Sequence, residues 1–427
     1  MKNLLYFGIF LISVVVFCKN TPDIPLEILQ HYPSTFVVAA ENETGLIRQD
    51  EAVTIDIEEI NSMYPDFNPQ AMVVFDGSSE LPSQSLDING DGKFDKLSFL
   101  TGFNPHEKKQ INIYYSPSGD KIRSYPQRTQ AELSYKFGGE FKKNQKGRFE
   151  YVGGQFKNMS YLRVPPQHTD HSFYIRYEGP GWESDKVGYR FYLDWRNAID
   201  IFGKKVPEMV LQNVGQDGFD SYHEMSDWGM DILKVGDALG VGGIGMWVEN
   251  LAKRVSETDS ITCEILASGP IHSQIHTKYF GWQVGGNKYN LASDLSIDAG
   301  CRMTQHDISI SGDPPNLCTG IVKHEDISLI EHSGGDADWG YVATYGKQSL
   351  VGDQLGMAIF YKKQDLIQTT EDQNNFVVVL KPMDGQLQYY FFAAWEQEYQ
   401  GITSESQFKD YLEIIRQKLD NPIKVRM

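Results

Sequence analysis

Several features that would place the chain in a common functional class are missing from its 427 residues. It has only 39 lysines and arginines against 57 aspartates and glutamates, a formal net charge of −18, and no block of basic residues. This balance argues against a nucleic-acid-binding protein, because phosphate contacts need a basic surface. Only one long apolar run is present, at the start, which excludes a membrane protein with several spanning helices.

Common catalytic motifs are also absent. The sequence contains no G-x-S-x-G, no H-E-x-x-H, no catalytic-cysteine signature and no C-x-x-C. The glycines of segment 240–245 lack the Lys-Ser/Thr pair that follows a phosphate loop. We therefore expect no organic cofactor, and the function has to be inferred from groups of polar residues.

The start of the chain has the composition of an export signal. Lys2 precedes an apolar run of signal-peptide length, and Cys18 follows it directly, as in bacterial lipoprotein signals, although Phe17 stands where those signals have a small residue. We expect residues 1–17 to be removed and Cys18 to be lipidated, with residues 18–35 as a linker. This anchors the protein in the cell envelope, at the periplasmic or outer-membrane face. Ordinary secretion into the periplasm and a retained anchor are the alternatives.

The remaining cysteines are Cys263, Cys301 and Cys318. An exported protein permits disulfides, and Cys301 with Cys318 is the nearest pair. The alternative is three buried thiols.

Alternating apolar and polar residues dominate the chain after residue 35 and predict half-buried antiparallel strands. The clearest segments are 53–58, 111–115, 131–137, 173–177, 189–195 and 271–279. Their number and the chain length indicate a mainly β protein of large stacked sheets. We expect one domain over residues 36–427, in which residues 36–130 have the length of a β subdomain.

Two segments are predicted to be helical. From Met225 to Leu239 apolar residues recur at helical spacing, although Gly229 and Gly236 weaken the pattern. Near the C-terminus, a stripe from Phe408 to Leu419 follows a capping box that begins at Ser404.

The segment DINGDGKFD, residues 87–95, has the oxygen-rich spacing of a calcium loop. The candidate ligands are the side chains of Asp87, Asn89, Asp91 and Asp95 and the backbone carbonyl of Lys93. Ser98 stands where an EF-hand has glutamate, so we expect a structural calcium ion between strands. The alternative is an Asp/Asn/Gly turn without an ion.

Two strands present polar faces that suit a hydroxyl-rich ligand. The first face is formed by Arg190, Tyr192, Asp194 and Arg196. The second is formed by His272, Gln274, His276 and Lys278, where the two histidines are too far apart to bind one metal ion. A solvated face with Arg–Asp pairs is the alternative for the first.

The segment from Tyr222 to Asp231 contains His223, the most credible single acid or base in the chain because histidine titrates near neutral pH. Asp227 and Asp231 would share one side of the predicted helix. The alternative is a helix start with capping carboxylates.

Several segments together resemble a family of exported bacterial proteins, known as a domain of unknown function, encoded among genes for the use of pectin- and ulvan-type polysaccharides. These segments are 189–204, 222–231, 240–243, 319–323, 355–358 and 393–396. The resemblance extends over about residues 35–425 and is strongest to ulvan oligosaccharide dehydratases. It implies a β-supersandwich similar to galactose mutarotases and some polysaccharide lyases. It also implies removal of water from a non-reducing-end uronic acid to leave a 4,5-unsaturated uronyl group.

That chemistry requires neutralisation of the uronate carboxylate, a base at C5 and an acid at the 4-oxygen. We assign Arg190 and Arg196 to the carboxylate or to a sulfate group, and Asn197 to the enolate. His223 is then the base or acid and Tyr192 its counterpart. The ligand is a uronate-containing oligosaccharide, and His272 and His276 are further substrate-binding candidates.

Three other functions are open. A polysaccharide lyase would use the same fold, and a carbohydrate-binding lipoprotein would perform no chemistry. A mutarotase-like or hydrolytic enzyme is the third, and a hydrolase would need two carboxylates, for which Asp227 and Asp231 are the obvious pair.

Overall fold

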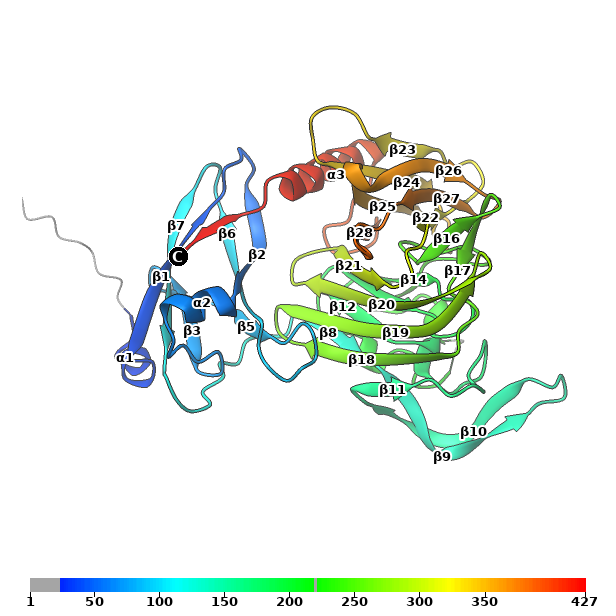
Figure 1. Ribbon diagram of the computed structural model, residues 1–427, viewed down its shortest axis with the longest axis horizontal. Helices are drawn as coiled ribbons and strands as arrows, with labels where there is room; N and C mark the ends of the chain where they lie inside the picture. The colour runs from blue at the N-terminus through cyan, green and yellow to red at the C-terminus, as the bar shows by residue number, and fades with distance from the viewer. Residues whose placement is uncertain (1–23, 219–220) are drawn as a thin grey trace, which may run out of the picture.

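The computed structural model describes residues 24–218 and 221–427 and has two β modules side by side (Figure 1). The predicted signal peptide and Cys18 lie outside the described residues. Helix α3, Glu405–Asp420, packs on the larger module, and the chain then returns to the smaller one. None of the helices in the described ranges is long and apolar enough to cross a membrane.

The smaller module pairs the first strands of the chain with the last one. Its sheets have the orders β29-β1-β7-β3-β4 and β2-β6-β5. Its elements are α1 Leu26–His31, β1 Ser34–Glu41, β2 Arg48–Asp56, α2 Ile57–Met63, β3 Met72–Asp76, β4 Ser79–Leu81, β5 Ser83–Leu86, β6 Lys96–Phe103, β7 Lys108–Tyr115 and β29 Lys424–Arg426. Ile111, Ile113 and Tyr115 alternate on β7 and are buried in the module's own core, as their spacing predicts.

The larger module contains a nine-stranded sheet of order β11-β18-β19-β20-β21-β28-β25-β24-β23. The strands are β11 Tyr161–Arg163, β18 Ser260–Ser268, β19 His272–Val284, β20 Asn287–Asp298, β21 Met303–Ile310, β23 Leu329–His332, β24 Trp339–Lys347, β25 Gln354–Lys362 and β28 Gln386–Trp395. Helix α3 covers β24 and β25. Ser404 caps this predicted helix by accepting a hydrogen bond from the Gln407 backbone N–H, and Phe408 and Leu412 are buried.

Two five-stranded sheets pack against the nine-stranded sheet. The first, called here the β8–β15 sheet, has the order β15-β14-β13-β12-β8, and the second has the order β17-β16-β22-β27-β26. The strands are β8 Thr129–Glu132, β12 Gly181–Ser184, β13 Val187–Phe191, β14 Ile199–Lys204, β15 Gly229–Asp231, β16 Gly245–Val248, β17 Leu251–Arg254, β22 Leu317–Val322, β26 Leu366–Glu371 and β27 Asn375–Leu380. Trp182, Tyr189 and Trp282 belong to the shared core. Each such buried aromatic side chain contributes roughly 1.5–3 kcal/mol. The predicted mainly β fold of stacked antiparallel sheets is thus confirmed.

A two-stranded arm projects from the larger module (Figure 1). Its strands are β9, Ser134–Lys143, and β10, Phe149–Asn158. The arm is bent, and Gly139 pairs with Gly153 within it (Figure 1). A Cβ atom at Gly139 would lie 2.4 Å from the Val152 carbonyl oxygen, so this close pairing needs glycine.

The helix predicted from Met225 to Leu239 is wrong. Strand β15 occupies part of this segment and pairs with β14. Gly229 has φ 131°, and a Cβ atom there would lie 1.8 Å from the Gly203 carbonyl oxygen, so this close pairing replaces the helix. Asp227 and Asp231 consequently do not share a helical face.

Two predicted strands also differ. Segment 173–177 is a loop that ends in the 3₁₀ turn Arg176–Glu178. Strand β13 ends at Phe191, and the Asn197 backbone N–H donates to the Asp194 carbonyl oxygen in the turn that follows. Arg196 therefore leaves the strand face predicted for it. The alternating pattern predicted strands wrongly at both places, because the backbone turns there instead of staying extended.

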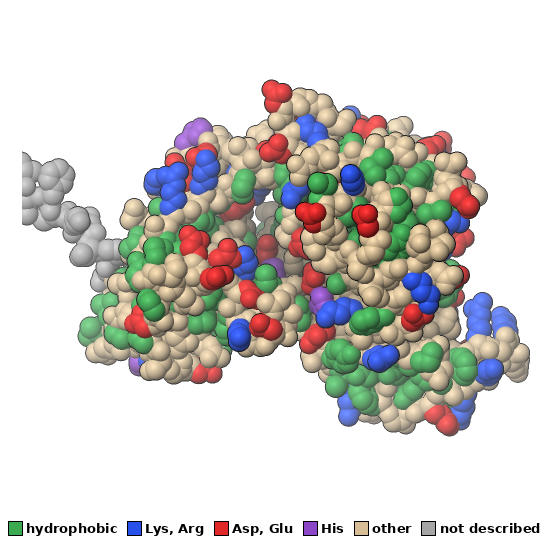
Figure 2. All heavy atoms as spheres, in the orientation of Figure 1, with side chains coloured by type: hydrophobic (Ala, Val, Ile, Leu, Met, Phe, Trp, Pro, Cys, Tyr) green, Lys and Arg blue, Asp and Glu red, His purple; other side chains and the backbone are tan. Residues whose placement is uncertain are grey.

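The three described cysteines are free thiols, so no disulfide joins Cys301 to Cys318. A hollow of about 850 Å³ separates the two modules and is lined by Trp339, Tyr390 and Tyr411 among others (Figure 2).

Candidate functional site

A layer of buried charge lies on the outer face of the β8–β15 sheet. Tyr189 and Phe191 of β13 enter the core, so Arg190 between them faces the other way. The layer consists of Glu132, Glu183, Arg190, Asp200, Lys204 and Asp231, all buried, and is called here the polar layer. Buried charges persist only when they are paired, and Lys204 Nζ, for example, lies 2.6 Å from Glu183 Oε2.

Arg190 is the centre of the polar layer and uses all five of its N–H groups. Nε donates to Asp200 Oδ2 at 3.2 Å, and Nη2 donates to Asp200 Oδ2 at 2.8 Å and Asp231 Oδ2 at 2.7 Å. Nη1 donates to the Tyr177 carbonyl oxygen at 3.1 Å and the Tyr222 hydroxyl at 3.0 Å. In this geometry the guanidinium positions its neighbours and has no donor left for a substrate carboxylate.

Tyr192 lies beside this guanidinium. Its hydroxyl is 3.1 Å from Arg190 Nη2 and donates to Asp200 Oδ2 at 2.7 Å. Burial raises the pKa of Tyr192 well above its ordinary value, so the phenol keeps its proton at neutral pH. Burial, followed by the nearby charge of Asp231, raises the pKa of Asp200 to about 6.

His223 completes the network at its exposed edge. It ends the 3₁₀ turn Ser221–His223, and its Nε2 lies 3.4 Å from Asp231 Oδ2. The ring centroids of His223 and Tyr222 are 4.5 Å apart. The His223 side chain is 46% exposed and that of Asp231 is 2% exposed, so a buried carboxylate orients a half-exposed imidazole. His223, Asp231, Arg190 and Tyr192 therefore form one continuous chain of contacts.

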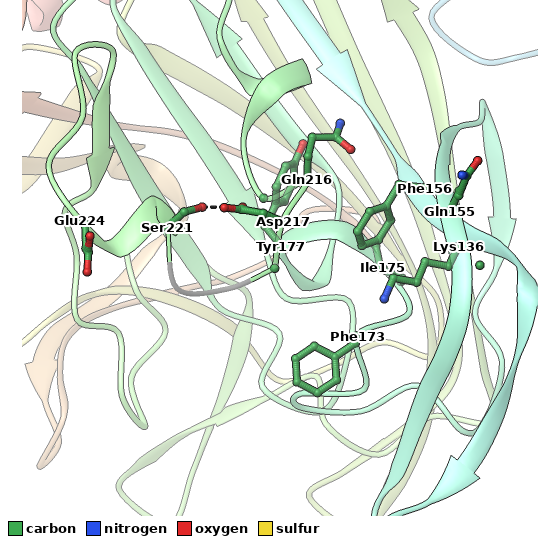
Figure 3. A pocket seen from close by; sticks show the side chains of 13 residues that line it. Lys136, Gln155, Phe156, Phe173, Ile175, Tyr177, Gln216, Asp217, Ser221 and Glu224 are labelled. Atoms are coloured by element: carbon green, nitrogen blue, oxygen red, sulfur yellow. Dashed lines mark hydrogen bonds between the residues drawn. The ribbon is translucent and has the colours of Figure 1, made fainter.

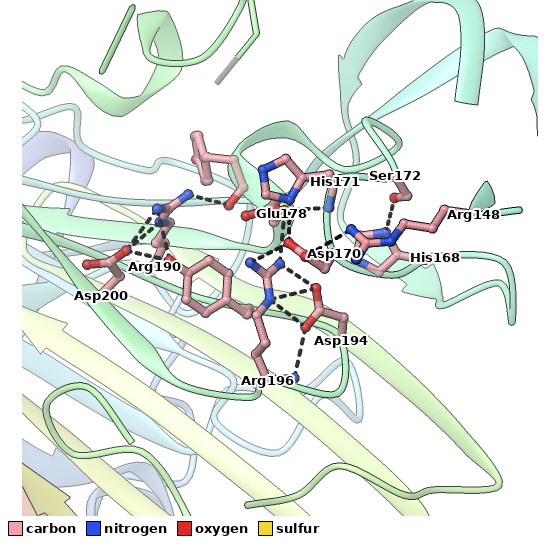
Figure 4. A network of polar contacts seen from close by, with 12 residues as sticks. Arg148, His168, Asp170, His171, Ser172, Glu178, Arg190, Asp194, Arg196 and Asp200 are labelled. Atoms are coloured by element: carbon pink, nitrogen blue, oxygen red, sulfur yellow. Dashed lines mark hydrogen bonds and ion pairs between the residues drawn. The ribbon is translucent and has the colours of Figure 1, made fainter. Parts of the chain in front are cut away.

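Arg196 anchors a second network beside the first (Figure 4). Its guanidinium lies 2.5 Å from Asp194, 2.9 Å from Asp170 and 2.9 Å from Glu178. It also stacks over the Tyr192 ring, 4.0 Å from the centroid. Burial alone would raise the pKa of Glu178, but the Arg196 charge holds it below its ordinary value.

The loop that supplies these acids has a strained backbone. His171, Phe173, Tyr177 and Glu178 all have φ between 37° and 68°. Non-glycine residues adopt such values at a cost and gather at functional sites. Asp170, His171 and Glu178 place ligand atoms within 4.8 Å of one another, the one such group of at least three among the described residues. Arg196 already neutralises two of its carboxylates, so the group does not fit a metal ion well.

A cleft of about 990 Å³ opens between the arm and the segment that precedes β15 (Figure 3). It is lined by Lys136, Gly154, Gln155, Phe156, Phe173, Ile175, Tyr177, Gly215, Gln216, Asp217, Gly218, Ser221 and Glu224. Aromatic rings with amides and hydroxyls are a lining that suits sugars. Ser221 and Glu224 stand within two residues of His223 in sequence, and the Tyr177 carbonyl oxygen accepts from Arg190, so the cleft lining is connected to the His223 network.

Lys136 is the cation of this cleft. Its side chain extends between Ile175 and Phe173 in Figure 3, and its Nζ lies 5.1 Å from the centroid of the Phe156 ring. It forms no ion pair with any residue in the described ranges, and partial burial lowers its pKa. Neither Lys136 nor Asp200 of the His223 network was identified as a site residue from the sequence. Alternation in 131–137 marked the strand, but no local signal showed that it would border a cleft.

The structure separates His272 and His276 from this site. Both lie on β19 next to the smaller module, where the Gln84 side chain accepts from the His272 backbone N–H. His272 Nδ1 lies 2.7 Å from Asp298 and His276 Nδ1 lies 2.8 Å from Asp294. Asn197 is also elsewhere than predicted: it is buried and donates to the Tyr279 hydroxyl at 2.8 Å.

The predicted calcium loop joins β5 to β6 at the surface, as its flanking strands suggested. Asp87 accepts from the Gly90 and Gly92 backbone N–H groups, both at 2.7 Å, and Asp91 accepts from that of Lys93 at 2.8 Å. Its carboxylates are not among the described groups of three whose ligand atoms converge. The oxygen donors suit calcium chemically, but the loop would have to rearrange for their atoms to converge on one ion. Calcium binding therefore stays a prediction.

Comparison with known proteins places the chain in a family. Residues 40–425 match the model described as "Domain of unknown function (DUF4861)", and the chain belongs to that family. The "Uncharacterized protein P7" of Formosa agariphila is 23% identical over 419 residues, which cover 91% of this chain and 92% of that protein.

Two solved structures are weakly similar. They are an alpha-mannosidase and a glycosyl hydrolase family 38 protein, both from Enterococcus faecalis. Each covers 92% of this chain at 9% identity, with TM-scores of 0.43 and 0.42. The chain spans about half their length, 46% and 47% respectively. Similarity of this size does not indicate a shared activity.

Proposed function

We propose that this member of the DUF4861 family is an oligosaccharide dehydratase that eliminates water from a non-reducing-end uronic acid. The proposal depends above all on one observation. His223, Asp231, Arg190 and Tyr192 form a continuous polar chain that adjoins a cleft lined by aromatic, amide and hydroxyl groups. The sequence resemblance to ulvan oligosaccharide dehydratases supplies the substrate class.

The geometry supports a division of roles between the two predicted acid–base residues. His223 is half exposed and is oriented by a buried carboxylate, the arrangement that general bases commonly use. Tyr192 remains protonated, because burial raises its pKa, and it lies in hydrogen-bond contact with Arg190 and Asp200. We therefore assign His223 as the base at C5 and Tyr192 as the acid.

In the proposed elimination the C5 proton moves to His223. The electrons of the C5–H bond form the C4=C5 double bond, and the C4–O bond breaks. The departing hydroxyl takes the Tyr192 proton, for which the phenol O–H turns from Asp200 to the leaving group, and leaves as water. The half-exposed His223 then releases its proton to solvent, and Tyr192 regains a proton through Asp200. No oxidant, reductant or second substrate is needed.

The substrate carboxylate needs a cation, because the C5 proton becomes acidic only when the developing enolate is stabilised. Arg190 has no free donor, and Arg196 already faces three carboxylates. Lys136 lines the cleft without an ion pair among the described residues, so we assign the carboxylate to Lys136. Export, lipidation at Cys18 and calcium at Asp87–Asp95 are further parts of the proposal.

The direct test is to incubate the purified mature protein with defined uronate-terminated oligosaccharides and to record mass and ultraviolet spectra. The expected result is loss of one water with unchanged chain length and new absorbance from the unsaturated uronyl group. Shortened chains with an unsaturated end would indicate a lyase instead. Unchanged spectra across glucuronate, iduronate and galacturonate termini would contradict an elimination at this site.

A matched variant tests the role assigned to Lys136. Lys136→Gln keeps a polar side chain, one atom shorter than lysine, but removes its charge. It should lower kcat and raise KM for a uronate-terminated substrate, because the cation of the developing enolate is lost, while the protein keeps its thermal unfolding midpoint. Lys288→Gln is the control, since Lys288 is exposed and pairs with Asp259 away from the cleft.

A further inference from the structure

The arm has a charge opposite to that of the protein as a whole. Between residues 134 and 158 it carries six cations against Glu140 and Glu150, whereas the complete chain has a net charge of −18. The cations are Lys136, Lys142, Lys143, Lys146, Arg148 and Lys157. Figure 2 shows basic side chains gathered at the projecting end of the molecule.

Most of these cations form no ion pair with a described residue. Within the described residues, Lys142 pairs with Glu140 at 2.9 Å and Arg148 with Asp170 at 3.7 Å. No ion pair to a described residue is formed by Lys143, Lys146 or Lys157. Lys142, Lys143 and Lys146 are exposed at the end of the arm.

Aromatic rings are interleaved with the lysines. Lys136, Lys143 and Lys157 lie over the rings of Phe156, Phe149 and Phe137, at 5.1, 5.3 and 5.6 Å from their centroids. Phe137 is 37% exposed despite its size. Ammonium groups beside partly exposed rings can contact both the carboxylates and the apolar faces of sugar rings.

The arm is held against the candidate site. The Tyr151 backbone N–H donates to the Ser172 carbonyl oxygen at 2.7 Å, and the Lys136 N–H donates to that of Tyr174 at 2.9 Å. Phe141, Tyr151 and Tyr174 pack together with centroids 4.9–5.1 Å apart. The 10 residues of β9 extend roughly 30 Å, from the cleft to the free tip. The basic surface is therefore continuous with the cleft wall.

We infer that the arm binds the polyanionic remainder of a polysaccharide whose terminal residue occupies the cleft. Lys142, Lys143 and Lys146 bind successive carboxylate or sulfate groups along the chain. This inference rests on the proposed function for the identity of the ligand. It adds a second binding region, which gives the enzyme a preference for long anionic chains over short ones.

The test uses a variant of the tip, Lys142→Gln/Lys143→Gln/Lys146→Gln, which leaves Lys136 and the His223 network intact. The control is Lys108→Gln/Lys288→Gln/Lys409→Gln, three exposed lysines that lie outside the arm. Binding of polygalacturonate, and of neutral dextran as the uncharged probe, is measured by calorimetry at low and high salt. Turnover of a short uronate-terminated oligosaccharide is measured with the same proteins.

The tip variant is expected to bind polygalacturonate about tenfold more weakly than wild type, because three exposed charge contacts are lost. The control should match wild type, and high salt should remove the difference between them. Dextran should bind to none of the three proteins through the arm. Turnover of the short oligosaccharide should be unchanged in the tip variant.

Equal binding of polygalacturonate by wild type and tip variant would overturn the inference. A second result would also overturn it. If wild type binds phosphatidylglycerol vesicles but not polygalacturonate, and the tip variant loses the vesicle binding, the arm docks on a membrane. If polygalacturonate binding depends on the tip but no oligosaccharide loses water, the arm inference holds and the dehydratase proposal fails.

Discussion

Two polar strand faces with similar sequence patterns have different surroundings. Arg190 of β13 turns away from the core into the polar layer, where the hydroxyl of Tyr192, just after the strand, contacts it beside an open cleft. On β19, His272 and His276 also turn away from the core, but they pair with Asp298 and Asp294 of the neighbouring strand, and the His272 backbone contacts Gln84 of the smaller module. Alternation thus identifies which side chains share a face, whereas the elements that cover the face decide whether it can serve as a site.

The largest expected difference between the two faces is in catalysis. His223→Ala should lower turnover of a uronate-terminated oligosaccharide by about 10²–10⁴-fold, because the general base is lost. His276→Ala, on the other face, should leave turnover close to wild type. Steady-state assays of unsaturated product check this, and equal losses in both variants would remove the distinction between the faces.

The second difference is in stability. Arg190→Met leaves two buried carboxylates without their cation and should cost about 3–5 kcal/mol of unfolding free energy. His272→Ala on β19 removes one partly exposed contact and should cost about 1 kcal/mol. Urea denaturation of the two variants and wild type measures both values, and comparable costs would show that the polar layer is not a unit.

The third difference is in pH dependence. Since the pKa of Asp200 is raised to about 6 in the folded protein, the folded state favours its protonated form. This stabilisation is complete below the unfolded pKa near 4 and is lost as the pH rises through about 6. Asp200→Asn imitates the protonated form, so its stability relative to wild type should rise between pH 4 and pH 7. A constant difference across that range, measured by urea denaturation, would contradict the raised pKa.

The smallest expected effect concerns the control face. Asp298→Asn should change neither KM nor kcat and should shift the thermal midpoint only slightly, because Asp298 is 40% exposed. A large rise in KM would show that the β19 face contacts substrate after all.

Much of the fold follows from the sequence. Period-two alternation located β7, β13 and β19, and the capping residue Ser404 located α3, because these signals depend only on neighbouring residues. The predicted helix at 225–239 failed because a glycine at Gly229 allows close strand pairing with β14, which helical spacing does not reveal.

The site was partly predictable. Arg190, Tyr192 and His223 were selected from residue chemistry, and the structure brings them into one network. The role of Arg190 was not predictable, because its full set of hydrogen bonds depends on Asp200 and Asp231 from two other strands. Lys136 has no local motif, since its position beside the cleft depends on backbone pairing with Tyr174, which is distant in sequence.

The most direct test of the account is a crystal structure of the His223→Ala variant with a saturated uronate-terminated oligosaccharide. We expect sugar in the cleft between the arm and Tyr177, with the terminal carboxylate in hydrogen-bond contact with Lys136 Nζ. Sugar bound instead in the hollow between the two modules, beside Trp339 and Tyr411, would contradict it.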